Sequence, residues 1–285
     1  MQPNRQDENF LPAEGGEKIK NHCFLMKGGI FMGIPSILAI LFAMAFSVIF
    51  PIGIMLYFRK MGGKWKTFLI GAATFIVFAM ILESILHNLI FLTPLWTILQ
   101  GNIWLYGLYG GLAAGVFEET GRFLAFKLIL KNEREPVAAL SYGIGHGGAE
   151  AILLVGVTMV NNLVLAAMAS AGATADPTVL ELAEQLTSTP AGMFLWAAFE
   201  RVGAIIVHVS LSVLVFAAVR VPGKKWLFPT AIGIHAAADF IAVVSNANLP
   251  VAATEFIVLI FALIVAVFAR MVYRTLPAAA QENEE

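Results

Sequence analysis

Charged residues are scarce in this chain, and cysteine is almost absent. Only 13% of the 285 residues are Asp, Glu, Lys or Arg, whereas 59% are apolar, and the mean hydropathy is +0.81. A composition this apolar lies far outside the range of soluble domains and indicates a polytopic membrane protein. The single cysteine, Cys23, excludes an internal disulfide framework and a cysteine-rich metal site. The net charge of −1 argues against a nucleic-acid partner.

Apolar runs long enough to cross a bilayer recur along the chain, and one crossing needs about 20 residues. We expect an all-α polytopic transmembrane helix bundle with seven spans. An eighth crossing is the alternative, because Pro35 and Pro51 could break the long first run. Residues 29–274 are expected to form one transmembrane domain, between a polar, disordered tail at 1–28 and an acidic tail at 275–285. The expected spans are 29–58, 67–93, 103–130, 137–170, 191–219, 226–247 and 251–273.

Lysine and arginine are missing from every second connection between these spans. They gather instead after the first, third, fifth and seventh spans, for example in RKMGGKWK and KNEREP. By the positive-inside rule the basic connections are cytoplasmic, which places the N-terminus outside and the C-terminus inside. Lys18, Lys20 and Lys27 in the N-terminal tail oppose this orientation, and an extra crossing near the start would remove the conflict.

Ionisable side chains nevertheless lie inside the spans, and four of the five histidines are among them. Each central charge costs about 2.5 to 3.5 kcal/mol on insertion scales, so such groups face one another, water or an ion rather than lipid. Counted inward from the basic ends, five of these groups share a layer roughly 14 to 18 Å deep at 1.5 Å per residue. The five are Glu118, Glu119, His146, His208 and His235.

Helical spacing adds a second regularity. His146 with Glu150, His235 with Asp239, Glu83 with His87, and Glu118 with Arg122 are four residues apart, which predicts that each pair shares a helix face. A carboxylate that accepts one ring N–H of a histidine leaves the other nitrogen free for a metal. Glycines at every fourth position of 107–115 predict close contact with another helix, and the glycines around His146 suggest that partner.

A carboxylate pair that faces histidines of three other helices fits a site that activates water. In one version the histidines bind zinc and a glutamate takes the proton of water. In a metal-free version the glutamate acts alone and the histidines stabilise the oxyanion. The sequence leaves both open, and the absence of HExxH means that the site is assembled across spans.

Four motifs, in order, resemble those of the YhfC family of intramembrane metalloproteases, relatives of the type II CAAX prenyl proteases and the PrsW proteases. They are EETGR at 118–122, GIGHGGAE at 143–150, the isolated His208, and HAAAD at 235–239. The resemblance implies Glu118 and Glu119 as the acid-base pair, with either as the base, and His146, His208 and His235 around the metal or water. Glu150 and Asp239 would orient histidines, and Arg122 would hold a carboxylate charged.

The spacing in EETGR is one residue shorter than the EExxxR typical of CAAX proteases and is similar to the EExxK of PrsW. The resemblance therefore implies proteolysis more strongly than it implies prenylated substrates. The expected partners are membrane lipid and a membrane-anchored peptide or protein, and the expected location is a bacterial inner membrane. We expect the site to open toward the cytoplasmic half.

Several of these side chains also have a structural interpretation. Glu118 with Arg122, and Glu200 with Arg201, would also suit ion pairs that hold the bundle together, and Glu83 with His87 favours such a role. The alternative function is a proton-coupled transporter that uses the Glu and His groups as a relay. A seven-helix receptor matches the span count and orientation only.

Overall fold

The computed structural model describes residues 31–173 and 176–277, and within these ranges the regular structure is entirely helical. The expected all-α membrane bundle is confirmed. The predicted tail at 1–28 and residues 278–285 of the acidic tail lie outside the described residues. The helices are α1 (Ile34–Lys60), α2 (Trp65–Phe75), η1 (Ile76–Glu83), α3 (Ser84–Phe91), α4 (Pro94–Gln100), α5 (Ile103–Leu124), η2 (Ala125–Ile129), α6 (Val137–Glu150), η3 (Ala151–Gly156), α7 (Val157–Ser170), α8 (Pro177–Ser188), α9 (Ala191–Arg220), α10 (Leu227–Asn248) and α11 (Val251–Tyr273).

Six helical segments are long and apolar enough to cross a membrane. The second runs without a break from α2 through η1 to α3, and the third from α6 through η3 to α7. Helix α5 is less apolar because it carries Glu118, Glu119 and Arg122, but it packs along α10, one of the six. With α5 the bundle has about seven crossings, and α1 is one unbroken helix in spite of Pro51.

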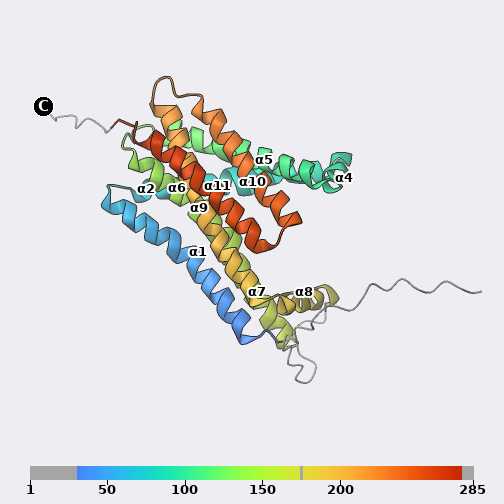
Figure 1. Ribbon diagram of the computed structural model, residues 1–285. Coiled ribbons are helices and arrows are strands. Elements are labelled where there is room, and N and C mark those ends of the chain that lie inside the picture. Colours follow the sequence, from blue (N-terminus) through green and yellow to red (C-terminus); the bar gives the residue numbers. More distant parts are fainter. Residues whose placement is uncertain (1–30, 174–175, 278–285) are drawn as a thin grey trace, which may run out of the picture.

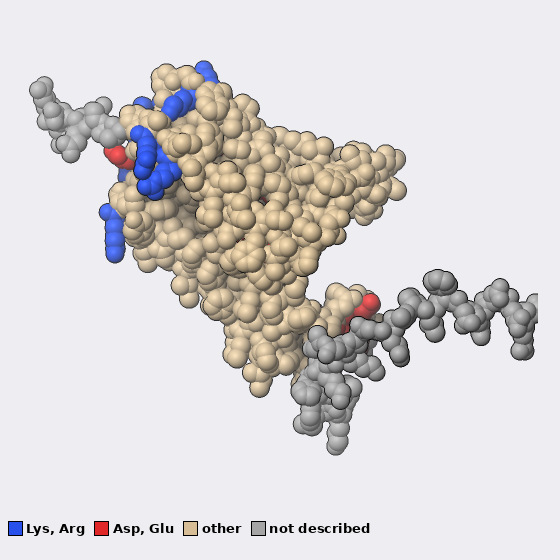
Figure 2. All heavy atoms as spheres, in the orientation of Figure 1, with Lys and Arg blue, Asp and Glu red and all other residues tan. Residues whose placement is uncertain are grey.

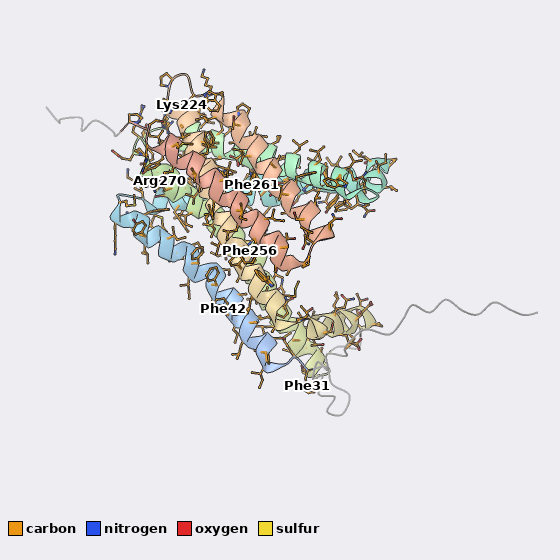
Figure 3. The ribbon with its side chains drawn as sticks, in the orientation of Figure 1. Phe31, Phe42, Lys224, Phe256, Phe261 and Arg270 are labelled. Atoms are coloured by element: carbon orange, nitrogen blue, oxygen red, sulfur yellow. The ribbon has the colours of Figure 1, made fainter. Side chains whose placement is uncertain are left out.

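The basic connections lie together at one end of the bundle. Figure 2 shows lysine and arginine side chains gathered there, around the ends of α1 and α11. Lys224 and Arg270 lie at this end in Figure 3, whereas Phe31 lies at the opposite end. We refer to the two sides as the basic end and the far end. In Figure 1 the helices are close together at the basic end and spread apart toward α4 and α8 at the far end.

Glycine allows the closest helix contacts, but the partners differ from those expected. A Cβ atom at Gly115 would lie 2.7 Å from the carbonyl oxygen of Ile232, and one at Gly111 would collide with that of Ala236. The glycine face of α5 therefore meets α10, and the expectation that it meets the glycines of α6 is wrong. Helix α6 uses its own glycines elsewhere, since a Cβ at Gly143 would lie 2.5 Å from Cα of Val209 in α9.

Two short helices at the far end, α4 and α8, were not expected. Helix α8 begins at Pro177, and the side chain of Asp176 caps it by accepting a hydrogen bond from the amide of Thr178. This combination of an Asp cap and a proline in the first turn is a helix-start signal that the sequence contains. Helix α8 packs on α7 through Ala183 and Leu186.

Apolar side chains fill the basic half of the bundle. Every residue of α9 from 210 to 218 is buried there, where this segment packs against α6, η2 and α10. Phe126, Tyr142 and Phe216 are among the largest fully buried side chains. This packing closes the bundle between the histidine layer and the basic end.

Candidate active site

The five side chains expected to share one depth do converge. Glu118 and Glu119 come from α5, His146 from α6, His208 from α9 and His235 from α10, and all five are buried. Arg122 of α5 is also fully buried beside them. Side chains on four helices thus form one polar cluster within an apolar bundle.

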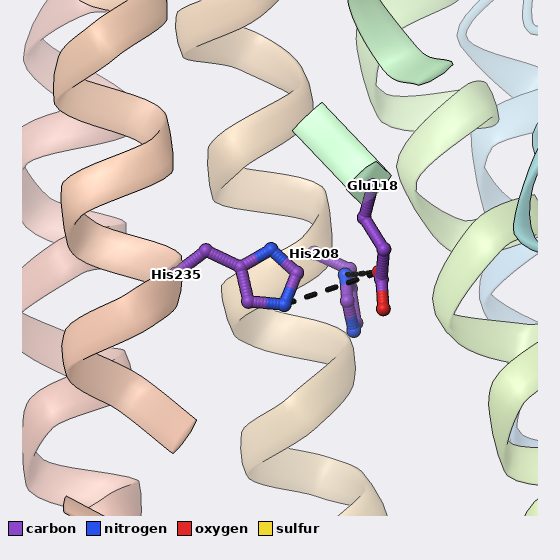
Figure 4. A group of neighbouring side chains, drawn as sticks. All are labelled: Glu118, His208 and His235. Atoms are coloured by element: carbon purple, nitrogen blue, oxygen red, sulfur yellow. Dashed lines mark ion pairs between the residues drawn. The ribbon is translucent and has the colours of Figure 1, made fainter. Parts of the chain in front are cut away.

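Three of these residues form a group that could hold a metal ion. Glu118, His208 and His235 each offer one ligand atom, and these atoms all lie within 4.8 Å of one another. Figure 4 shows both imidazoles directed at the carboxylate. Oε2 of Glu118 lies 3.9 Å from Nδ1 of His208 and 3.9 Å from Nε2 of His235.

His235 is oriented by a hydrogen bond to Glu119 at the ring nitrogen that faces away from Glu118. Nδ1 of His235 donates to Oε1 of Glu119 at 2.8 Å, and the same carboxylate pairs with the guanidinium of Arg122. A proton on Nδ1 leaves a lone pair on Nε2, the nitrogen that faces Glu118. Among the described ion pairs Arg122 joins Glu119 three residues away, not Glu118 four residues away as the spacing predicted.

His208 forms an ion pair with Glu150 of α6. Nε2 of His208 lies 2.5 Å from Oε2 of Glu150, whose other oxygen accepts a hydrogen bond of 2.7 Å from Arg201. Arg201 also pairs with Glu200. Glu150 therefore does orient a histidine, but one from another helix rather than His146, its neighbour in the sequence motif.

His146 donates through Nε2 to Oε2 of Glu118 at 2.7 Å, while its Nδ1 is buried without a hydrogen-bond partner. It holds the Glu118 carboxylate. The group of three possible ligands thus contains Glu118, which was expected to act as a base, in place of His146, which was expected beside the metal or water. Asp239 approaches Nε2 of His235 at 3.7 Å, on the side that faces Glu118. It is thus not placed to hold the ring through Nδ1, because Glu119 does so.

Three π-helical segments interrupt or extend the α-helices beside this cluster. The π-helical segment η3 begins directly after Glu150, η1 ends at Glu83, and η2 follows the last turn of α5. Such π-helical turns are frequent at functional sites because the extra residue per turn redirects side chains. Here η3 continues the crossing into α7 directly after the segment in which His146 meets Glu118 of α5 and Glu150 meets His208 of α9.

The cluster opens on a cavity of about 120 Å³, which we call the site cavity. Glu118, His208, His235 and Asp239 line it, together with Ala242 and other residues of α9 to α11. Ala242 also lines two larger cavities of about 380 and 350 Å³, and all three extend from the histidine layer toward the far end. With a cytoplasmic basic end, as the positive-inside rule predicts, these three cavities would open toward the outer half and not toward the cytoplasmic half as expected.

The donor set fits a divalent metal such as zinc. Two imidazoles and one carboxylate are a common ligand set of catalytic zinc, and each imidazole here is held by a carboxylate at its other nitrogen. One rearrangement is required, because Nδ1 of His208 accepts a hydrogen bond of 3.2 Å from Arg122. Binding of a metal at this nitrogen would break that bond, while Arg122 would keep Glu119 as its partner.

A second pair of ionisable residues, Glu83 and His87, lies beside the cluster. Glu83 and His87 are joined as their spacing predicted, with Nε2 of His87 3.1 Å from Oε1 of Glu83. Sequence reasoning did not single out Tyr109, whose hydroxyl lies 2.7 Å from Nδ1 of His87, or Ala242, where the three cavities meet. No sequence signal marks either residue, since their positions follow from the packing of α3, α5 and α10.

Comparison with known proteins identifies the family of the chain and one relative. The family model of the YhfC intramembrane metalloproteases matches residues 46–273, a range that includes the whole cluster. The chain is 37% identical to the uncharacterized membrane protein YhfC of Bacillus subtilis (strain 168) over 187 residues, which cover 62% of this chain and 72% of the relative. No solved structure matches the chain.

Proposed function

The chain belongs to the YhfC intramembrane metalloprotease family, and from this premise we propose that it is an endopeptidase that cleaves membrane-anchored peptides. The observation that carries the proposal is the buried group of Glu118, His208 and His235, drawn from three helices and facing one cavity. Both histidines have a carboxylate at the outer nitrogen. This arrangement favours hydrolysis over a proton relay, because a relay needs groups spread through the depth of the membrane.

In this proposal Glu118 is the acid-base residue. It lines the site cavity, whereas both oxygens of Glu119 lie in the protein interior, one of them bound to His235 and Arg122. Glu118 takes a proton from water as the water oxygen attacks the peptide carbonyl carbon. It then returns the proton to the amine nitrogen as the peptide bond breaks, which leaves a carboxylate and an amine.

The remaining residues position these groups. Glu119 and Glu150 hold the two imidazoles, His146 holds Glu118, and Arg122 balances the charge of Glu119. Held by His208, His235 and Oε2 of Glu118, a divalent ion, which we propose to be zinc, would polarise the carbonyl and make water more acidic, while Oε1 of Glu118 is left to take the proton. We further propose that the basic end is cytoplasmic, so that substrate reaches the site from the outer half of a bacterial inner membrane.

The test uses full-length protein in proteoliposomes with a library of peptides that share one apolar anchor, and mass spectrometry identifies the products. We expect fragments with the wild type and none with Glu118→Gln. Glu181→Gln, which changes an exposed carboxylate on α8, is the matched control and keeps full activity. Intact peptides with the wild type, together with movement of a solute across the vesicle membrane, would contradict the proposal and support the transporter.

A further inference from the structure

A larger cavity of about 380 Å³, here called the side cavity, adjoins the site cavity on the far side of Asp239. The two share Asp239 and Ala242 as lining residues. A group bound in the side cavity would therefore lie next to any peptide bond held at Glu118. The lining residues are Glu83, His87, Phe91, Trp96, Tyr106, Tyr109, Gly110, Gly111, Ala114, Asp239, Ala242 and Val243.

The charged side chains of this cavity are carboxylates. Glu83 reaches it from η1 and Asp239 from α10, and none of its lining residues is Lys or Arg. The far-end connections around 92–102, 171–190 and 249–250 carry no Lys or Arg either. In the lining of the side cavity and in these connections, as far as the structure describes them, a cation meets no lysine or arginine. It gains two carboxylates, which are costly within the span unless a counter-charge is present.

A hydrogen-bond chain fixes one of these carboxylates. Glu83 is joined to Nε2 of His87 at 3.1 Å, and Nδ1 of His87 lies 2.7 Å from the hydroxyl of Tyr109. The chain links η1 and α3 to α5, so the carboxylate is fixed against both walls of the cavity. A fixed acceptor spends less conformational entropy on binding than a free side chain does.

Aromatic rings form the outer wall. The ring centroids of Phe91 and Trp96 lie 4.0 Å apart, and those of Trp96 and Tyr106 lie 6.0 Å apart. Aromatic faces attract a cation and also pack against an aliphatic stem. The side cavity thus offers apolar rings near its outer wall and carboxylates further in, which complements a long side chain with a positive end.

We propose that the side cavity is a specificity subsite that binds a lysine or arginine side chain of the membrane-anchored substrate. This inference rests on the proposed peptidase function. Glu83 and Asp239 bind the positive group, and the rings of Phe91, Trp96 and Tyr106 contact the aliphatic stem. The scissile bond lies within a short distance of this basic residue along the substrate, because Asp239 lines both cavities.

Binding is tested separately from cleavage. Two dye-labelled peptides share one apolar anchor and differ at a single position near its end, lysine in one and norleucine in the other. Fluorescence anisotropy in detergent micelles measures the dissociation constant of each for the full chain. We expect the lysine peptide to bind about tenfold more tightly, since a hydrogen-bonded charge contributes roughly this factor. Glu83→Gln should abolish most of the difference, while Glu181→Gln, with the same loss of charge outside the cavity, should preserve it.

Equal binding of both peptides by the wild type, or an unchanged difference in Glu83→Gln, would overturn the subsite. A second variant, Trp96→Ala, should weaken both peptides, because the rings contact the stem, and unchanged affinity of both would also count against it. Cleavage is then measured on the same peptides. Cleavage without a preference for the lysine peptide would contradict this inference alone. Tight lysine-dependent binding without any cleavage would contradict the proposed function alone.

Discussion

Nδ1 of His235 on α10 donates a hydrogen bond to Oε1 of Glu119 on α5, 2.8 Å away, and Nε2 of the same ring faces Glu118. Adjacent acids of one helix thus have different surroundings, because Glu119 turns toward Arg122 and the interior while Glu118 turns toward the cavity. The close packing of α5 on α10 through Gly111 and Gly115 brings the imidazole within reach of both.

The first prediction concerns Glu119. The substitution Glu119→Gln keeps a hydrogen-bond acceptor for His235 but leaves the fully buried Arg122 without a negative partner. Loss of one member of a buried pair costs about 3 to 5 kcal/mol. We expect a decrease of about 3 kcal/mol in the free energy of unfolding, measured by SDS titration of detergent-purified protein. The exposed control Glu181→Gln should change it by less than about 0.5 kcal/mol. A stable Glu119→Gln protein would show that Arg122 has another source of compensation.

The second prediction separates ligands from the residues that position them. We expect metal-loaded wild type to contain one zinc per chain, and His208→Ala and His235→Ala to contain almost none, by elemental mass spectrometry. His146→Ala should keep its zinc with about tenfold lower affinity, since His146 acts through Glu118 and outer partners contribute about this much. A His146→Ala protein as depleted as the other two would place His146 among the ligands. Wild type without metal under all loading conditions would favour water activated by glutamate alone.

The third prediction concerns the place where the three cavities meet. Ala242 lines all of them, and the substitution Ala242→Phe adds a ring at their junction without removing a charged group. We expect peptide turnover to fall at least about tenfold, because misplacement of a substrate by about 1 Å costs more than this, while zinc content stays unchanged. Ala247→Phe, on an exposed position of the same helix, is the control and should keep wild-type activity. Normal turnover in Ala242→Phe would mean that substrate approaches by another route.

Much of the architecture follows from the sequence. Apolar runs of about 20 residues leave a chain no alternative to transmembrane helices, because unpaired backbone groups are too costly in lipid. The shared depth of Glu118, His146, His208 and His235 follows from the same argument, since rise per residue converts a position in the sequence into a depth. This reasoning needs only one helix at a time.

The partner of each side chain could not be obtained in this way. Spacing along one helix suggested Glu118 with Arg122 and His146 with Glu150, but the bundle joins Arg122 to Glu119 and Glu150 to His208. The opening toward the far end likewise depends on which half of the bundle is filled, and the residues of α9 from 210 to 218 fill the basic half.

The sequence by itself thus determined the helices, their approximate depths and the residues that cannot face lipid. The tertiary structure alone decided which carboxylate holds which histidine, which glycine face meets which helix, and where the cavities lie. The reason is physical. Hydrophobic burial and helix rise are properties of single segments, whereas ion pairs and cavities depend on the rotation of each helix about its axis, which is set by contacts between segments distant in the chain.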